Sequence, residues 1–139
     1  LHDAAEDVFP DRKPQISLSD YARNLAQLVD TLRRQSPRTR IVWALTTPRF
    51  LYCYEPRHLP FDRWKAKPNI ARYNARARAV MRARGIAVND LHAAILKNGA
   101  ARCIQSLDGL HMTEFGNEVL ARAVAGAVAA CLSAPSAAR

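Results

Sequence analysis

Several markers of metal centres and membrane proteins are missing from this sequence. It has only three cysteines in 139 residues, and no two of them have the Cys-x-x-Cys spacing of a zinc site. No apolar run approaches the roughly 20 residues that a membrane-spanning helix needs, since residues 123–132 cover only about half of that length. We therefore expect no metal or other cofactor and no membrane span, and we interpret residues 123–132 as a buried helix face.

Acidic residues are also scarce. There are 12 of them against 21 Lys and Arg, which gives a formal net charge of +9. Such a balance raises the question of nucleic-acid binding. However, the arginines are scattered, and Arg72, Arg76, Arg78 and Arg82 fall away from the apolar face of a predicted helix. No basic motif is interleaved with aromatic residues, so we expect no nucleic-acid partner.

The chain has the composition of a globular domain. Its apolar content is 49%, and it contains no internal repeat. We expect residues 1–132 to belong to one domain and the Ala- and Ser-rich residues 133–139 to form a frayed tail.

Apolar residues recurring at helical spacing predict three helices before residue 100. The first covers about residues 20–35 with Ser19 as its N-cap, and its apolar face consists of Tyr21, Leu25, Leu28, Val29 and Leu32. The second begins at Pro68 and ends before Gly85, because proline suits a first helical turn and glycine a helix end. A short third helix covers residues 91–98.

A final helix follows Thr113, which is a suitable N-cap. The residues of this helix that we expect to face the core are Val119, Leu120, Ala123, Val124, Ala127, Val128 and Cys131. Two continuous apolar runs, residues 41–46 and 86–89, have the pattern of strands buried on both faces of a parallel sheet.

Alternating helices and strands predict an α/β fold with parallel strands and right-handed crossovers. In such sheets, sites lie beyond the carboxyl ends of the strands. The long connection over residues 49–68 and the loop before Thr113 should both emerge at that end. Because Cys53 and Cys103 lie in these loops, an oxidising compartment could join them in a disulfide.

An aspartate and a histidine stand three residues apart in the last loop. A carboxylate such as that of Asp108 can hold the Nδ1 proton of an imidazole such as that of His111, which leaves Nε2 free to take a proton from a nucleophile. These are two of the three members of a serine-hydrolase triad. The alternatives are an Asx turn for Asp108 and a surface or capping role for His111.

The order of short motifs along the chain resembles that of the SGNH/GDSL hydrolases, whose last block is an Asp-x-x-His pair before the final helix. The matching segments are Leu1-His2-Asp3, Val42-Trp43-Ala44-Leu45-Thr46-Thr47-Pro48, Tyr73-Asn74, Val88-Asn89-Asp90-Leu91 and the pair Asp108 and His111. The resemblance implies a flavodoxin-like three-layer α/β/α sandwich. It also implies a serine esterase that acts on small-molecule or carbohydrate esters.

The same resemblance identifies what the chain does not contain. The family's nucleophilic serine lies in a Gly-Asp-Ser block, which is absent here, so we expect this sequence to be the C-terminal part of a longer protein. His2 stands where the family has an asparagine that donates to the oxyanion. An imidazole N–H could take that role, and the alternative is an ordinary terminal residue.

Aromatic residues gather in the long connection. Together with Thr47, the side chains of Tyr52, Tyr54 and Trp64 could line a substrate pocket, and the alternative is that they anchor the loop. We expect Tyr73, Asn74 and His92 to serve the architecture. A rival function for the whole chain is a non-catalytic module that binds a carbohydrate or an anionic ligand. We further expect residues 1–139 alone to be marginally stable, because two strands bury little core.

Overall fold

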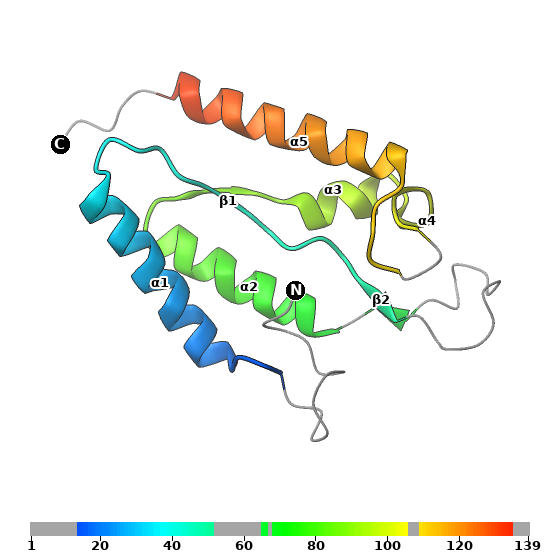
Figure 1. Cartoon of the computed structure of the whole chain (residues 1–139), viewed down its shortest axis with the longest axis horizontal. Helices are drawn as coiled ribbons and strands as arrows, with labels where there is room; N and C mark the ends of the chain where they lie inside the picture. The colour runs from blue at the N-terminus through cyan, green and yellow to red at the C-terminus, as the bar shows by residue number, and fades with distance from the viewer. Residues whose placement is uncertain (1–13, 52–64, 67, 106–108, 135–139) are drawn as a thin grey trace.

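The computed structural model describes residues 14–51, 65–66, 68–105 and 109–134. Helices and short strands alternate along these residues (Figure 1). In chain order the elements are α1 (Leu18–Gln35), β1 (Val42–Ala44), β2 (Phe50–Leu51), β3 (Lys65–Ala66), α2 (Pro68–Ala83), β4 (Ala87–Asn89), α3 (Leu91–Lys97), α4 (Ala100–Cys103) and α5 (Glu114–Ser133).

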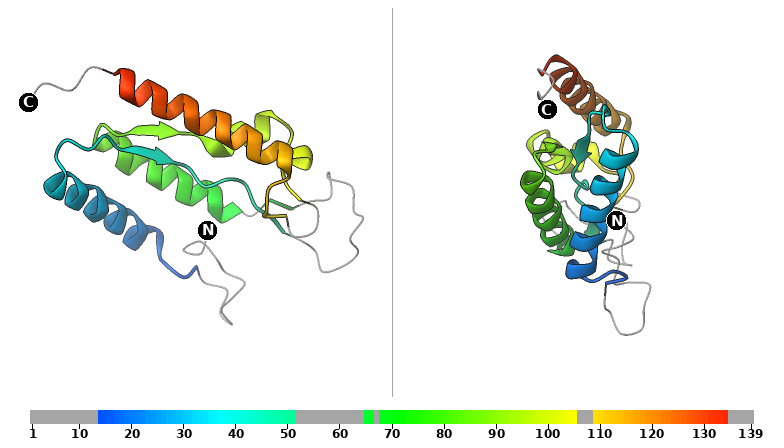
Figure 2. Two further views of the ribbon diagram at one scale, coloured as in Figure 1. Left: turned by 45° about the horizontal axis from the view of Figure 1, so that its top comes forward. Right: turned by 90° about the vertical axis from the view of Figure 1, so that its left-hand side faces the viewer.

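Strands β1 and β4 are parallel neighbours, with Trp43 opposite Val88. Helices α1 and α2 pack on one face of this pair, while α5 contacts both strands on the other face (Figure 2). The predicted α/β class with parallel strands is therefore confirmed, although both strands are shorter than predicted. The antiparallel pair β2 and β3 and the helix α4 were not predicted.

The core has two parts. One lies between α1, α2 and the sheet, where Val29, Ala77 and Met81 are almost fully buried. The other lies between α3, α4, α5 and β2, with Ile95, Ile104 and Val119 among its buried residues. Each large buried side chain contributes on the order of 1.5–3 kcal/mol relative to an exposed one.

Helix α1 begins two residues earlier than predicted, and its N-cap is Ser17 rather than Ser19. The Asp20 N–H donates to Ser17 Oγ over 3.1 Å. On the predicted apolar face, Leu25 and Val29 are buried, but Leu28 and Leu32 are 48% and 39% exposed. These two leucines belong to the predicted apolar face but stay accessible, because among the described residues no element covers that side of α1.

Helix α2 has the predicted limits. Pro68 is its first residue, and Gly85 follows its end with a φ of +60°, a backbone conformation that favours glycine. The Arg84 guanidinium holds the Asp30 carboxylate through two 2.9 Å hydrogen bonds, which lowers the pKa of Asp30 and joins the end of α2 to α1.

Helix α5 has the predicted N-cap, since the Gly116 N–H donates to Thr113 Oγ1 over 3.0 Å. Its first turns pack tightly, whereas Val124, Val128 and Leu132 are 43%, 47% and 66% exposed. The prediction that Val124 and Val128 face the core was wrong, because in the described part of the chain no element reaches that side of α5.

By length and composition, α5 is also the one described helix that could cross a membrane, with a mean hydropathy of 1.3. Only 11% of that stretch is buried, because α5 contacts α3, α4 and the sheet with one side and leaves the other side exposed.

The two described cysteines are free thiols. Cys103 is fully buried, and this burial raises the pKa of its thiol. Its predicted disulfide partner, Cys53, lies outside the described residues. Cys131 is half-buried on α5, so the prediction of a small buried hydrophobic residue is met only in part.

The two glycines of α5 provide a matched test of the packing between α4 and α5. A Cβ at Gly116 would lie 2.1 Å from the carbonyl oxygen of Cys103, whereas a Cβ at Gly126 would meet nothing within 4 Å. We expect Gly116→Ala to lower the free energy of unfolding by at least about 2 kcal/mol through overpacking. Gly126→Ala should raise it by about 0.5–1 kcal/mol through helix propensity.

Urea unfolding followed by far-ultraviolet circular dichroism would measure both variants. Equal effects of the two substitutions would contradict the close approach of α5 to α4.

Candidate active site

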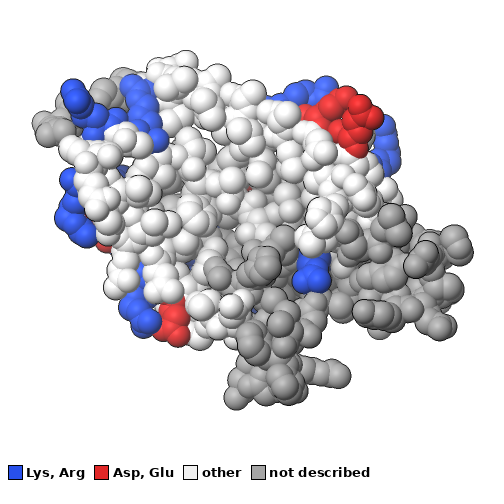
Figure 3. Space-filling view, viewed as in Figure 1, with Lys and Arg blue, Asp and Glu red and all other residues white. Residues whose placement is uncertain are grey.

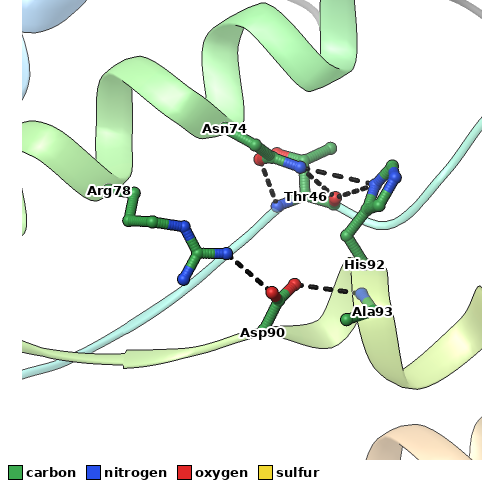
Figure 4. Close-up of polar contacts among 6 residues, drawn as sticks. All are labelled: Thr46, Asn74, Arg78, Asp90, His92 and Ala93. Atoms are coloured by element: carbon green, nitrogen blue, oxygen red, sulfur yellow. Dashed lines mark hydrogen bonds and ion pairs between the residues drawn. The ribbon is translucent and has the colours of Figure 1, made fainter.

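The carboxyl end of β1 is fixed by a side chain from α2. The Thr46 N–H donates to Asn74 Oδ1 over 2.9 Å, and Asn74 Nδ2 donates to the Thr46 carbonyl over 2.8 Å (Figure 4). Asn74 thus makes the pair of bonds that a neighbouring strand would otherwise make with this residue. Because Asn74 is buried, these bonds also satisfy its own amide.

A histidine from α3 joins the same carbonyl. His92 Nδ1 lies 3.2 Å from the Thr46 oxygen and 3.4 Å from Asn74 Nδ2. A carbonyl oxygen can only accept, and the contact with it is the shorter one, so we assign the ring proton to Nδ1. The predicted architectural role of Asn74 and His92 corresponds to these contacts at the exit of β1.

The carboxyl end of β4 carries Asp90, which is the N-cap of α3. Its Oδ1 accepts from the Ala93 N–H over 2.9 Å, and its Oδ2 accepts from Arg78 over 2.6 Å (Figure 4). Partial burial opposes ionisation of this carboxyl, but the Ala93 and Arg78 hydrogen bonds outweigh it and lower the pKa of Asp90. A carboxylate therefore persists beside the β4 exit at neutral pH.

Downstream of β1 the chain contacts the loop that contains the predicted histidine. The Phe50 N–H donates to the Gly109 carbonyl over 3.0 Å. Gly109 has a φ of +64°, and a Cβ on it would lie 2.6 Å from the Phe50 carbonyl oxygen. Only glycine fits this position without displacing β2, so the close approach fixes the backbone two residues before His111.

The other side of that loop is held by Gln105. Its N–H donates to the His111 carbonyl over 2.8 Å, and its own carbonyl accepts from the Gly109 N–H over 3.1 Å. The Gln105 side chain donates to the Met112 carbonyl over 2.8 Å. The backbone from Gly109 to Met112 is therefore bonded both to β2 and to the segment after α4.

The structure describes only two of the predicted site residues. His111 is exposed and lies in the loop that β2 contacts, and Thr47 is half-buried in the segment between β1 and β2. This segment connects the regions of the two residues, because it runs from Thr47 to Phe50, and Phe50 is hydrogen-bonded to Gly109 in the loop of His111. The predicted residues that lie outside the described residues are His2, Tyr52, Tyr54, Trp64 and Asp108.

Sequence reasoning missed two residues that hold the loop, Phe50 and Gln105. For Phe50 the only signal was its place in a long connection, and for Gln105 there was none. Gly109 could have been noticed, since glycine after aspartate is typical of a turn with positive φ. Within the described ranges, no group of three or more His, Cys, Asp or Glu side chains could hold a metal ion.

Comparison with known proteins gives both a family and a fold. The family model for GDSL-like Lipase/Acylhydrolase proteins matches residues 6–119. A search of curated proteins found no match. The esterase domain of the ZfL2-1 ORF1 protein from the zebrafish ZfL2-1 retrotransposon superposes with a TM-score of 0.63 at 18% identity. That comparison covers 82% of this chain and 60% of the other.

Two further solved structures are similar. A Parabacteroides merdae protein described as a GDSL-like lipase has a TM-score of 0.59 at 19% identity, with 83% of this chain and 51% of the other covered. LAE5, an alpha/beta hydrolase from the metagenome of Lake Arreo in Spain, has a TM-score of 0.59 at 20% identity, with 91% and 53% covered. The chain thus spans between half and two thirds of the length of these neighbours, and the likeness confirms the flavodoxin-like fold.

The Asn74 contacts predict the effect of removing its amide. We expect Asn74→Ala to lower the free energy of unfolding by about 1–3 kcal/mol, because the Thr46 N–H loses its partner and the Thr46 carbonyl keeps only the His92 contact. Hydrogen exchange at the Thr46 amide should accelerate by roughly tenfold or more. Asn24→Ala, at an exposed position of α1, is the matched control and should change neither quantity. Unchanged exchange at Thr46 in Asn74→Ala would contradict the role of this side chain.

The lowered pKa of Asp90 predicts a pH-dependent contribution to stability. Asp90 has a lower pKa in the folded state than in the unfolded state. Its contribution to stability is therefore fully present at pH values above the ordinary pKa of aspartate, and it is lost as the pH falls through the lowered pKa. Asp90→Asn retains a capping oxygen but loses the charge. It should therefore lower the free energy of unfolding in urea at pH 7 by less than about 1 kcal/mol, and this deficit should shrink below about pH 4.

A double-mutant cycle with Arg78→Gln isolates the ion pair at each pH. A coupling between the two positions that is equally large at neutral and at acidic pH would show that the charge on Asp90 is not its source.

Proposed function

Because the chain belongs to the GDSL-like lipase/acylhydrolase family, we propose that it is part of a serine esterase in which His111 is the general base. Asp108 orients the imidazole, and the nucleophilic serine is supplied by a Gly-Asp-Ser segment outside residues 1–139. The reaction is transfer of an acyl group from an ester first to this serine and then to water.

The observation that carries this proposal is the way in which the loop of His111 is held. Its backbone is bonded to Phe50, beyond the carboxyl end of β1, and to Gln105 after α4. A general base needs a fixed position relative to its nucleophile, and a loop bonded on two sides is suited to that. The exposure of His111 leaves its ring accessible to a substrate.

The proposed steps follow from ordinary acyl-transfer chemistry. Serine Oγ attacks the ester carbonyl while His111 Nε2 takes its proton, and the same nitrogen then protonates the departing alcohol. Water hydrolyses the acyl-serine by the same route. We propose that His2 donates an N–H to the oxyanion, and that Thr47, Tyr52, Tyr54 and Trp64 line the pocket for a small-molecule or carbohydrate ester.

The described serines support an external source of the nucleophile. Ser17 and Ser36 cap the two ends of α1, Ser19 lies in its first turn, and Ser133 is the last residue of α5. None of these four follows a strand at the carboxyl edge of the sheet. The neighbouring structures are also longer than this chain, so their additional residues provide room for such a segment.

The test is ester hydrolysis by the complete protein that contains this chain. We expect His111→Ala to lower kcat/KM for p-nitrophenyl acetate by about 10³-fold or more, because the serine loses its base. Labelling of the serine by a fluorophosphonate should fall in parallel. Lys97→Ala, at an exposed position of α3, is the control and should leave both unchanged. Turnover that survives in His111→Ala would reject this residue as the base.

A further inference from the structure

The two sides of the sheet differ in charge. In the view of Figure 3, most of the charged side chains surround a broad uncharged area that lies over β1, α5 and α1. Helix α2 lies behind β1 in this view (Figure 2). Its 16 residues include four arginines and neither aspartate nor glutamate. Part of the net charge of +9 is therefore concentrated on the side of the sheet that α2 covers.

Three of these arginines lie on the side of α2 that faces away from the core. The buried side of the helix contains Ala77 and Met81, both 0% exposed. With 3.6 residues per turn, Arg72, Arg76 and Arg82 all fall within about 60° of the opposite direction, and all three are exposed. We call these three arginines the basic face. It extends over about 15 Å of the helix axis.

The basic face is not neutralised by any carboxylate in the described part of the chain. The fourth arginine of α2, Arg78, binds Asp90 over 2.6 Å. By contrast, none of the three arginines of the basic face forms an ion pair with a described residue. Their guanidinium groups are therefore available to an anionic partner.

Between these arginines the outer side of α2 has only small side chains. They are Ala71, Ala75, Ala79 and Ala83, and all four are exposed. This side offers no aromatic ring to stack on a base or a sugar, and no amide to recognise a base edge. It also offers no large apolar side chain that would insert among acyl chains. The basic face can thus bind a partner only through charge, at the partner's surface.

Helix α1 lies beside α2 and makes this side of the molecule broad. The ring centroids of Tyr21 and Tyr73 are 4.9 Å apart. At the other end of the two helices, Arg33 donates to the Arg84 carbonyl over 2.6 Å. Two adjacent helices are roughly 20 Å wide, which exceeds the width of about 12 Å of the DNA major groove. A flat array of phosphates fits this layer better than the groove of a duplex does.

We propose that the basic face holds the protein on a lipid surface rich in anionic headgroups, and that the ester substrate resides at that surface. The preference for lipid over nucleic acid rests in part on the proposed function, because esters with long acyl chains collect in lipid. Each basic residue near an anionic leaflet strengthens binding by about fivefold, so three of them should strengthen it by roughly 100-fold.

The test uses the complete protein that contains this chain. Cosedimentation should show binding to phosphatidylcholine vesicles that contain about one third phosphatidylserine, and much weaker binding to phosphatidylcholine alone. Binding should fall steeply between about 0.1 and 1 M salt, because the Debye length decreases from roughly 10 to 3 Å. Equal affinity for the two kinds of vesicle would overturn the inference.

Variants assign the binding to the basic face. The triple variant Arg72→Gln, Arg76→Gln, Arg82→Gln should bind phosphatidylserine vesicles roughly 100-fold more weakly, whereas lysine at the same three positions should retain the affinity within about threefold. Arg76→Gln alone should cost about fivefold. Its matched control is Arg122→Gln, on α5 across the sheet, where the side chain is 70% exposed. This control should cost less than about twofold.

Far-ultraviolet circular dichroism verifies that every variant is folded, and a DNA duplex of random sequence tests the competing partner. The inference is overturned if the triple glutamine variant binds phosphatidylserine vesicles normally, or if the lysine variant binds as weakly as the glutamine variant. It is also overturned if the glutamine substitutions weaken DNA binding and leave vesicle binding unchanged.

Hydrolysis tests where the substrate resides. With p-nitrophenyl decanoate dissolved in phosphatidylserine vesicles, the triple glutamine variant should be slower by roughly tenfold or more at subsaturating vesicle concentrations. Its kcat/KM for soluble p-nitrophenyl acetate should equal that of the unsubstituted protein. If vesicle binding is lost but hydrolysis of the dissolved ester is not, the substrate does not depend on the lipid surface and that part of the inference is rejected.

Binding and catalysis are measured separately, so the two proposals can fail independently. If vesicles bind through the basic face but the protein hydrolyses no ester, the lipid-binding surface stands and the esterase assignment falls. If the protein is a His111-dependent esterase and the triple glutamine variant binds vesicles normally, the esterase assignment stands and the lipid-binding surface falls.

Discussion

The rest of the described site depends on one interaction, the pair of hydrogen bonds between the Asn74 side-chain amide and the peptide groups of Thr46. It pairs the Thr46 N–H and, together with His92, the Thr46 carbonyl, and it does so from a helix rather than a strand. The exit of β1 is therefore tied to α2, while His92 ties it to α3. Asp90 fixes the neighbouring exit of β4 with the help of Arg78.

From the exit of β1 the chain runs to Phe50, whose backbone contacts hold the loop of His111 in place. Phe50 bonds to Gly109, and the lack of a Cβ on Gly109 allows the two backbones to approach. On the far side, Gln105 bonds to the same loop, and the close contact of Gly116 with Cys103 holds α5 against α4. Side chains at the strand exits and backbone at the loop thus act together to limit how far His111 can move.

The distribution of charge and apolar surface follows from the same architecture. The two-stranded sheet gives α1 and α5 too little surface to bury their apolar faces completely, so Leu32, Val124 and Val128 stay accessible. Arginines meanwhile occupy the outer side of α2, where water solvates them. The high net charge is thus compatible with a broad uncharged side beside β1.

The sequence by itself determined the order and kind of the main elements, because each depends on local chemistry. The helical spacing of apolar residues predicted α1, α2 and α5. Thr113 indicated the start of α5, and Gly85 indicated the end of α2. Parallel pairing of β1 with β4 followed from that alternation. The motif order also indicated the GDSL family, which the family model confirms.

Only the tertiary structure decided which apolar residues are covered and what the polar residues bond. Periodicity marks a face as apolar but does not say whether another element lies on it. For this reason Val124 and Val128 were predicted to face the core and are exposed, and Leu28 and Leu32 on the predicted apolar face of α1 are exposed as well. Likewise, the contacts of Phe50 with Gly109 and of Gln105 with His111 join residues distant in sequence or within an irregular loop. Such contacts depend on how the packed helices and strands bring two backbone segments together, and local residue patterns do not encode the distance between those segments.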